Sequence, residues 1–159
     1  MKYDIRPIEE RDIDECVNMA IETFGTNHYP KEQFDSIREE LMMGLQEPHW
    51  GRPNYFVCEL GSGKIVGMAG YVQSWLDWDT FEFFWLSVRK GYYGKGIGKA
   101  LVEYREQEII SKSAFKDDVT IMFSCTREVI KYHEKHGYGI LLEKAAGKEV
   151  IMGKTFMKK

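Results

Sequence analysis

Residues 88–106 read VRKGYYGKGIGKALVEYRE, a glycine-rich, cationic turn followed by an amphipathic segment. An apolar, β-rich run ends at Val88, and a helical pattern begins near Gly96. A helix N-terminus presents unpaired main-chain N–H groups and a partial positive charge. Glycines let such a main chain approach a ligand closely, because they have no Cβ. The stretch therefore predicts an anion-binding turn between a strand and a helix.

Size and net charge limit what this anion is. The chain has 159 residues, of which 43% are hydrophobic, which suits a single domain over residues 1–159 with its own core. The formal net charge of −3 argues against a nucleic-acid binder that relies on an overall basic field. We therefore expect a small anion and no nucleic acid, with contact of this local basic patch with RNA as the alternative.

Cysteines and apolar runs indicate the compartment. Cys16, Cys58 and Cys125 are far apart and form no CxxC pair, which is typical of buried thiols rather than of disulfides or a metal site. Charges begin at Lys2, unlike in a signal peptide, and no apolar run approaches the length of a membrane span. We expect a cytoplasmic protein without a metal or a membrane contact.

Hydrophobic periodicity predicts strands and helices in the order β-α-α-β-β-β-α-β-α-β-β. This pattern favours a sandwich of helices on one mixed sheet. The first helix is expected to bury a face made of Ile13, Val17, Ala20 and Ile21, and the second a stripe of Phe34, Ile37, Leu41 and Leu45. The expected strands are residues 3–8, 55–60, 65–75, 80–88, 119–125, 138–145 and 150–157, and the expected helices are residues 12–24, 30–45, the segment after Gly96, and 127–136.

Two familiar phosphate-binding patterns do not fit the turn. The Walker pattern GxxxxGK[ST] needs a glycine where Tyr93 stands and a Ser or Thr where Ala100 stands. The dinucleotide pattern GxGxxG fails because Lys99 or Leu101 occupies its third glycine position, depending on the register.

A third pattern fits. Residues 86–102, LSVRKGYYGKGIGKALV, closely resemble the acyl-CoA-binding segment of the Gcn5-related N-acetyltransferase (GNAT) family, although Tyr93 stands where that family usually has Arg or Gln. Residues 126–143, TREVIKYHEKHGYGILLE, are similar to a second signature of the family, which begins with Asn-x-x-Ala and ends in Tyr-Glu-Lys-x-Gly-Phe. The order of elements and the length also agree, so the resemblance covers essentially the whole chain.

The resemblance implies an α+β or α/β fold of GNAT type, with a central mixed, mostly antiparallel sheet flanked by about four helices. It implies acetyl-CoA as the cofactor, with its pyrophosphate on the N–H groups of the turn and its pantetheine arm along the preceding strand. The cofactor-binding residues implied in this way are Leu86, Ser87, Val88, Tyr93, Gly94, Lys95, Gly96, Ile97, Gly98, Lys99 and Thr126.

Acetyl transfer from a thioester to an amine needs a neutral amine, a stabilised oxyanion and a protonated leaving thiolate. Direct attack in a ternary complex needs no protein nucleophile. Glu82, the lone acid in the run FEFFWLSV, is the candidate base, and its spacing is similar to that of the base in the histone-acetylating branch. The alternatives are a solvated or structurally paired Glu82, with a water chain as base.

The candidate acid is His133, which stands where the family often has a tyrosine. Tyr132 takes this role if the alignment shifts by one residue. A surface or supporting role is the alternative for His133.

The acceptor is expected to be a primary amine of a small molecule or of a peptide. Trp75 and Glu82 lie where the family often lines its acceptor site, and a ring and a carboxylate suit a cationic amine. The alternative for Trp75 is a loop or core tryptophan. Residues 24–34 correspond to a loop that covers the acceptor in relatives, and relatives often dimerise, so a homodimer is also expected.

Two other functions stay open. A non-catalytic module that senses acyl-CoA is supported by the off-pattern residues Tyr93, Thr126 and His133. The other is acetylation of a protein lysine or N-terminus instead of a small molecule.

Overall fold

The computed structural model describes residues 1–28, 31–46, 51–112, 118–144 and 146–157. The order of strands and helices is the predicted one. Within the described residues, no helix is both long enough and apolar enough to span a bilayer. In chain order the elements are β1 (Tyr3–Pro7), a 3₁₀ turn (Glu10–Asp12), α1 (Ile13–His28), α2 (Lys31–Met43), β2 (Asn54–Leu60), β3 (Ile65–Gln73), β4 (Thr80–Val88), α3 (Ile97–Lys112), β5 (Val119–Thr126), a 3₁₀ turn (Arg127–Val129), α4 (Ile130–Glu134), β6 (Gly139–Glu143) and β7 (Glu149–Phe156).

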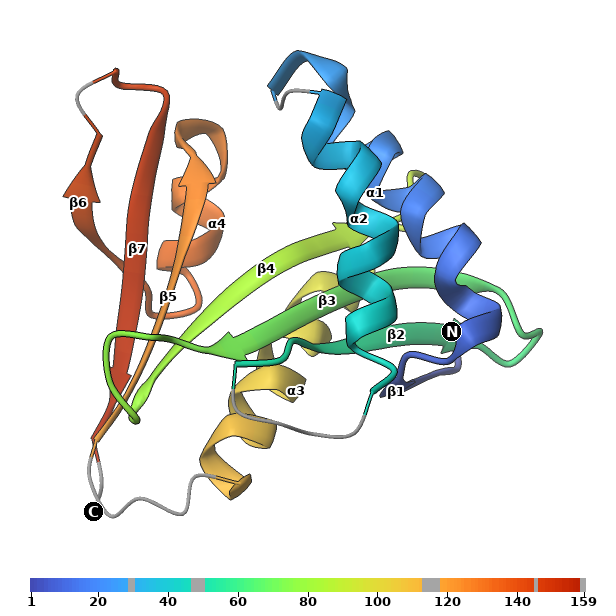
Figure 1. Ribbon diagram of the computed structural model, residues 1–159, viewed down its shortest axis with the longest axis horizontal. Coiled ribbons are helices and arrows are strands. Elements are labelled where there is room, and N and C mark those ends of the chain that lie inside the picture. Colours follow the sequence, from blue (N-terminus) through green and yellow to red (C-terminus); the bar gives the residue numbers. More distant parts are fainter. Residues whose placement is uncertain (29–30, 47–50, 113–117, 145, 158–159) are drawn as a thin grey trace.

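The strands form one sheet in the order β1-β2-β3-β4-β5-β7-β6. All neighbouring pairs are antiparallel except β4 and β5, which are parallel. The predicted mixed, mostly antiparallel sheet is therefore confirmed. β4 and β5 pair only between Thr80 and Glu82 on β4 and between Thr120 and Met122 on β5. Beyond these residues the two strands diverge, and the sheet opens into a V (Figure 1).

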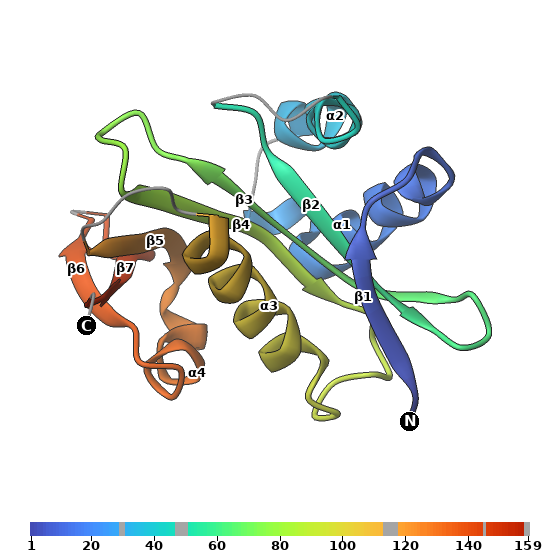
Figure 2. The same cartoon turned by 90° about the horizontal axis from the view of Figure 1, so that it is seen from below.

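Helices cover both faces of the sheet: α1 and α2 lie on one face, and α3 and α4 on the other (Figure 2). The start of α3 packs tightly against Gly67 of β3. A Cβ at Gly67 would lie 2.9 Å from Leu101 Cδ1 and 3.0 Å from Ile97 Cγ2. Because Gly67 pairs with Val88, the last residue of β4, this close approach places the glycine turn and the α3 N-terminus at the open side of the sheet.

The buried face of α1 differs from the prediction. Ile21 was expected on that face, but 40% of its surface is exposed, whereas Cys16 and Met19 are fully buried. At about 100° per residue, Ile21 lies one step beyond the stripe that runs through Ile13 and Ala20. On α2 the predicted stripe is confirmed, with Phe34, Ile37 and Leu41 buried and Leu45 packed against the same core.

β4 carries a bulge where it leaves β5. The register of β4 against β3 shifts there, and Trp85 has φ = 52°, the only positive φ of a non-glycine residue in the described part of the chain. This conformation costs a residue with a Cβ roughly 1–2 kcal/mol. Side chains of α1 and α2 hold it: the Trp85 indole Nε1–H donates to Glu40 Oε2 at 2.8 Å, and the ring of Phe24 packs edge-on against Trp85 at 5.2 Å.

An ion-pair network fixes the first turn of the chain. The Arg6 guanidinium donates to both carboxylate oxygens of Asp12, at 2.7 and 3.0 Å, and to Glu59 Oε2 at 2.8 Å. Asp12 Oδ2 also accepts from the Glu9 main-chain N–H. Burial would raise the pKa of Asp12, but these hydrogen bonds outweigh burial and lower it. The network joins β1, the 3₁₀ turn and β2.

Candidate active site

The glycine turn presents main-chain donors without internal partners. Gly94 and Gly96 have φ values of 72° and 82°, which a side chain would strain. The first hydrogen bond of α3 runs from Ala100 N–H to the Gly96 carbonyl at 2.9 Å. The N–H groups of residues 93–99 donate no hydrogen bond within the part of the chain that the structure describes. They open a 16-residue helix, so the turn can bind an anion such as a phosphate group.

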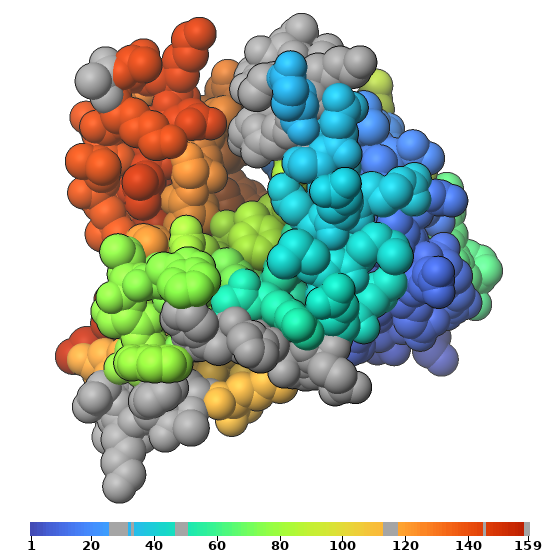
Figure 3. All heavy atoms as spheres, viewed as in Figure 1, coloured from blue at the N-terminus to red at the C-terminus, as the bar shows by residue number. Residues whose placement is uncertain are grey.

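A cavity of about 910 Å³ occupies the V between β4 and β5. The hollow opens between α2 and the C-terminal strands in Figure 3. Its wall continues through the sheet, from the end of α1 on one face to α3 on the other. The cavity is lined by Thr23, Phe24, Glu40, Met43, Pro53, Tyr55, Val72, Glu82, Phe83, Phe84, Trp85, Leu86, Val102, Arg105, Phe123, Ser124, Cys125, Thr126, Glu128, Val129, Tyr132, His133, Tyr138, Lys144 and Glu149.

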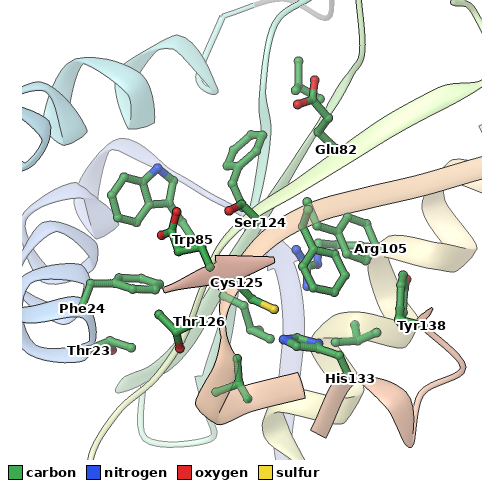
Figure 4. A pocket seen from close by; sticks show the side chains of 18 of the residues that line it. Thr23, Phe24, Glu82, Trp85, Arg105, Ser124, Cys125, Thr126, His133 and Tyr138 are labelled. Atoms are coloured by element: carbon green, nitrogen blue, oxygen red, sulfur yellow. The ribbon is translucent and has the colours of Figure 1, made fainter. Parts of the chain in front are cut away.

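The structure brings together five of the predicted site residues. Glu82, Leu86, Thr126, Tyr132 and His133 all line the cavity. Figure 4 shows Glu82 at one end of the pocket and His133 well apart from it. The two candidate proton-transfer groups therefore lie on different sides of one space, as an acid and a base that act on different atoms would.

Other predicted residues lie outside the cavity wall. Trp75 is 77% exposed in the connection between β3 and β4, so its predicted contact with an acceptor stays a prediction. Ser87 is buried, and its Oγ has no hydrogen-bond partner among the described residues, so its predicted contact with a cofactor stays a prediction. Of the predicted covering segment, Tyr29 and Pro30 lie outside the described residues, whereas Phe24 lines the cavity.

Tyr132 connects the cavity to the glycine turn. Its ring lines the cavity, and its hydroxyl lies 2.6 Å from the position that a Cβ on Gly98 would occupy. Gly98 is therefore the residue that lets the phenol reach the start of α3. Burial raises the pKa of Tyr132, so its hydroxyl keeps its proton at neutral pH.

His133 is electrically neutral in this environment. Its imidazole packs at 4.4 Å from the Phe123 ring and 5.2 Å from the Tyr132 ring. Burial, followed by the positive charges of His136 and Arg105, lowers the pKa of His133 to about 4. At pH 7 only ~0.1% of the molecules would carry an imidazolium at this position. An imidazolium at this position is therefore not the form that prevails near neutral pH.

Glu82 is the free carboxylate of the cavity. The other carboxylates in the wall each have a partner: Glu40 binds the Trp85 indole, Glu128 accepts from Thr126, and Glu149 pairs with Lys144. Glu82 makes no hydrogen bond or ion pair with any described residue. Glu82 is the last residue of β4 that pairs with β5, and its side chain lines the cavity where the two strands diverge, so it is available to a ligand in the V.

The described residues indicate neither a reactive thiolate nor a metal site. Burial raises the pKa of all three thiols, to about 12 for Cys16 and about 11 for Cys58, so Cys125 beside the cavity is also a thiol at neutral pH. The described residues contain no cluster of three or more His, Cys, Asp or Glu side chains with the spacing to hold a metal ion.

Sequence reasoning missed several residues of the wall, of which Arg105 has the clearest signal. Ile97, Leu101, Arg105 and Ile109 follow one another at four-residue steps, so Arg105 interrupts the apolar stripe of α3. An interrupted stripe of this kind marks a buried polar group. Glu40 and Trp85 gave no such signal, because their contact joins α2 to a strand that is distant in sequence.

A family model now identifies the fold. The model of the acetyltransferase (GNAT) domain matches residues 51–140, more than half of the chain. The chain belongs to the GNAT family. The matched segment runs from β2 through the glycine turn to α4, and so contains the V, the turn and the candidate acid.

Solved GNAT structures cover almost the whole chain. PaiA N-acetyltransferase from Thermoplasma acidophilum, in complex with coenzyme A, has a TM-score of 0.74 and 16% identity, over 98% of this chain and 100% of that one. An aminoglycoside 6′-N-acetyltransferase complexed with coenzyme A has a TM-score of 0.73 and 17% identity, over 98% of both chains. A spermidine N-acetyltransferase chimera from Vibrio cholerae and hSSAT has a TM-score of 0.71 and 17% identity, over 99% and 96%.

At these identities the likeness confirms the fold, a GNAT sheet of mixed direction with helices on both faces. The sequence has no significant match among curated proteins. GNAT enzymes use acetyl-CoA as acyl donor, and the free N–H groups of residues 93–99 fit its pyrophosphate.

Proposed function

We propose that this GNAT protein is an acetyl-CoA-dependent N-acetyltransferase that acts on a primary amine by direct attack in a ternary complex. The observation that carries the proposal is the junction of the turn and the cavity. A helix N-terminus whose donors have no partner among the described residues lies directly beside a cavity that contains the free carboxylate of Glu82 and the neutral phenol of Tyr132.

The main chain of the glycine turn and of β4 would hold the cofactor. The N–H groups of residues 93–99 would bind the pyrophosphate, and the exposed side chains of Lys95 and Lys99 add positive charge there. Beyond Glu82, the β4 main chain has no strand partner on the β5 side, so it is available to the amide groups of a pantetheine arm. Bound acetyl-CoA supplies a thioester with an acetyl group ready for transfer.

Glu82 would act as the general base. An amine that enters the cavity is an ammonium ion at neutral pH, and it must lose a proton before it can attack. The Glu82 carboxylate is the acceptor for that proton, directly or through a water molecule, because it has no partner among the described residues.

Tyr132 would act as the general acid. Its Oη holds the proton that the departing sulfur takes up, and its position at Gly98 puts that proton beside the start of α3. His133, which is neutral and packed on Phe123, would orient the Tyr132 ring instead of donating the proton. This reverses the order in which the sequence alone ranks the two residues.

The acceptor would be an amine of positive charge. Carboxylates of α2, β4 and β7 line the cavity, and the indole of Trp85 and the ring of Phe24 lie at the same wall. Carboxylates and aromatic rings both attract ammonium groups. Two of the similar structures are named for amine substrates, spermidine and an aminoglycoside, which supports an amine acceptor here too.

Two measurements test the proposal together. The first is calorimetry with coenzyme A, and the second is an acetyl-CoA turnover assay with polyamines, amino acids, aminoglycosides and short peptides as acceptors. We expect coenzyme A to bind and at least one amine to be acetylated. Glu82→Gln and Tyr132→Phe should each lower kcat by ~100-fold or more while coenzyme A affinity is retained.

Three outcomes would count against parts of the proposal. Binding of coenzyme A without turnover of any amine in the panel would favour the acyl-CoA-sensing module. A well-folded protein that releases no heat with coenzyme A would remove the basis for the enzyme itself. A loss of activity in His133→Gln that exceeds the loss in Tyr132→Phe would return the acid role to His133.

A further inference from the structure

The buried face of α3 contains a cation. Arg105 is 1% exposed, and its side chain is the largest of those that are fully buried in the described part of the chain. It nevertheless lines the cavity, and Figure 4 shows it on the same side of the pocket as His133 and Tyr138. The mechanism proposed above does not use this residue.

Neutral groups alone hold the guanidinium of Arg105. Its Nε–H donates to the Leu101 carbonyl at 3.2 Å, and Nη1 donates to the Gly70 carbonyl of β3 at 2.9 Å. Its Cζ lies 3.7 Å above the centre of the Phe83 ring. A guanidinium has five N–H groups, and Nη2 makes no hydrogen bond with any described residue. The group is therefore fixed in place with part of its donor fork unused.

No acid among the described residues neutralises Arg105. The adjacent Glu106 accepts a hydrogen bond from Tyr138 Oη at 2.9 Å and forms an ion pair with Lys154 at 3.6 Å. No ion pair of the described residues includes Arg105. Burial lowers the pKa of Arg105 to about 9, which still leaves it protonated at pH 7. A buried charge is normally paired, so an unpaired one beside a cavity points to a ligand that supplies the opposite charge.

We propose that Arg105 binds a carboxylate of the substrate at the α3 side of the cavity. A planar fork fixed over Phe83, with free N–H groups, suits the two oxygens of a carboxylate. The inference rests on the proposed acyltransferase function and specifies its substrate class. The carboxylate belongs either to the acyl group, as in a dicarboxylic acyl-CoA, or to the amine acceptor, as in an amino acid.

Wild-type protein tests both sources without any substitution. In the first arm, calorimetry compares succinyl-CoA with butyryl-CoA, which has an acyl chain of equal carbon number but no carboxylate. In the second arm, steady-state assays with acetyl-CoA compare an ω-amino acid with the alkylamine of the same length. We expect at least a tenfold preference for the carboxylate-bearing partner in one arm, either in Kd for the acyl-CoA or in KM for the amine.

Two variants then locate the preference. Arg105→Gln should reduce the ratio between the matched ligands to about twofold or less, and Arg105→Lys, which keeps the charge but not the fork, should give an intermediate ratio. Less than a twofold preference in both wild-type arms would overturn the inference, as would a preference that persists in a folded Arg105→Gln protein. If coenzyme A binds and amines are acetylated without such a preference, only this inference fails and the proposed function stands.

Discussion

The contact between Gly98 and Tyr132 makes the effect of one substitution depend on the other. A Cβ at Gly98 would lie 2.6 Å from Tyr132 Oη, a separation that forces a shift, but 3.6 Å from the ring carbon Cζ, an ordinary van der Waals contact. Gly98→Ala should therefore cost roughly 1–3 kcal/mol of overpacking, partly offset by up to about 1 kcal/mol of better helix propensity. In the Tyr132→Phe background the hydroxyl is absent, and only the helix-propensity gain remains.

Urea unfolding of the wild type, the two single variants and the double variant measures this coupling. We expect Gly98→Ala to lower the free energy of unfolding in the wild type and to leave it equal or higher in the Tyr132→Phe background, a coupling of about 1–3 kcal/mol. Gly98→Ala should also lower kcat, because the displaced hydroxyl leaves its position at the start of α3.

Gly96→Ala is the matched control. Its Cβ would meet nothing within 4 Å, but its φ of 82° strains any residue with a side chain. Its cost should be the same in both backgrounds. If Gly98→Ala also costs the same in both backgrounds, Tyr132 does not reach Gly98, and the assignment of Tyr132 as the acid loses its geometric basis.

Two further predictions concern electrostatic contributions to stability. His133 binds its proton less readily when folded, with a pKa of about 4 against 6.5, so the free energy of unfolding should fall on acidification through that window, by on the order of 3 kcal/mol. Urea titrations at several pH values should show a flatter fall in His133→Gln, and equal falls would contradict a half-buried, neutral imidazole. Asp12→Asn should lower the free energy of unfolding by about 2–4 kcal/mol in the same assay, because it leaves Arg6 without its bidentate partner. The control is Asp14→Asn, which removes an exposed ion pair with Arg38 and should cost less than about 1 kcal/mol. Similar losses in the two variants would refute this account.

Local signals predicted most of the fold. The order of strands and helices follows from apolar periodicity, and the stripe of Phe34, Ile37 and Leu41 is the buried face of α2. The error at Ile21 shows the limit of this reasoning, because neighbouring positions on a helix differ by only about 100° and the exact angle of burial is set by the partner surface. The turn at Gly94 and Gly96 was predictable because both residues have a positive φ, a local backbone conformation that favours glycine.

The chemical environment of the site was less predictable. The resemblance to the GNAT family implied that Glu82, Tyr132 and His133 belong to one site, and they do line one cavity. The preferred candidate acid changed from His133 to Tyr132, because His133 packs on Phe123 and lies near the charge of Arg105. Both neighbours come from other elements of the fold. A pKa depends on burial and on nearby charges, and neither is visible in a single stretch of sequence.

The sequence by itself determined the features whose physical cause is local: the helices, the strands, and a glycine turn whose unpaired N–H groups open α3. Tertiary structure alone decided that β4 bulges at Trp85, where Glu40 accepts a hydrogen bond from the indole. It also decided that the absence of a side chain at Gly98 leaves room for the hydroxyl of Tyr132. Likewise, it decided that Arg105 is buried without an acidic partner among the residues that the structure describes. Each of these depends on side chains from distant segments that meet only when the sheet and its helices pack, and that meeting sets which groups are charged, neutral or free to bind.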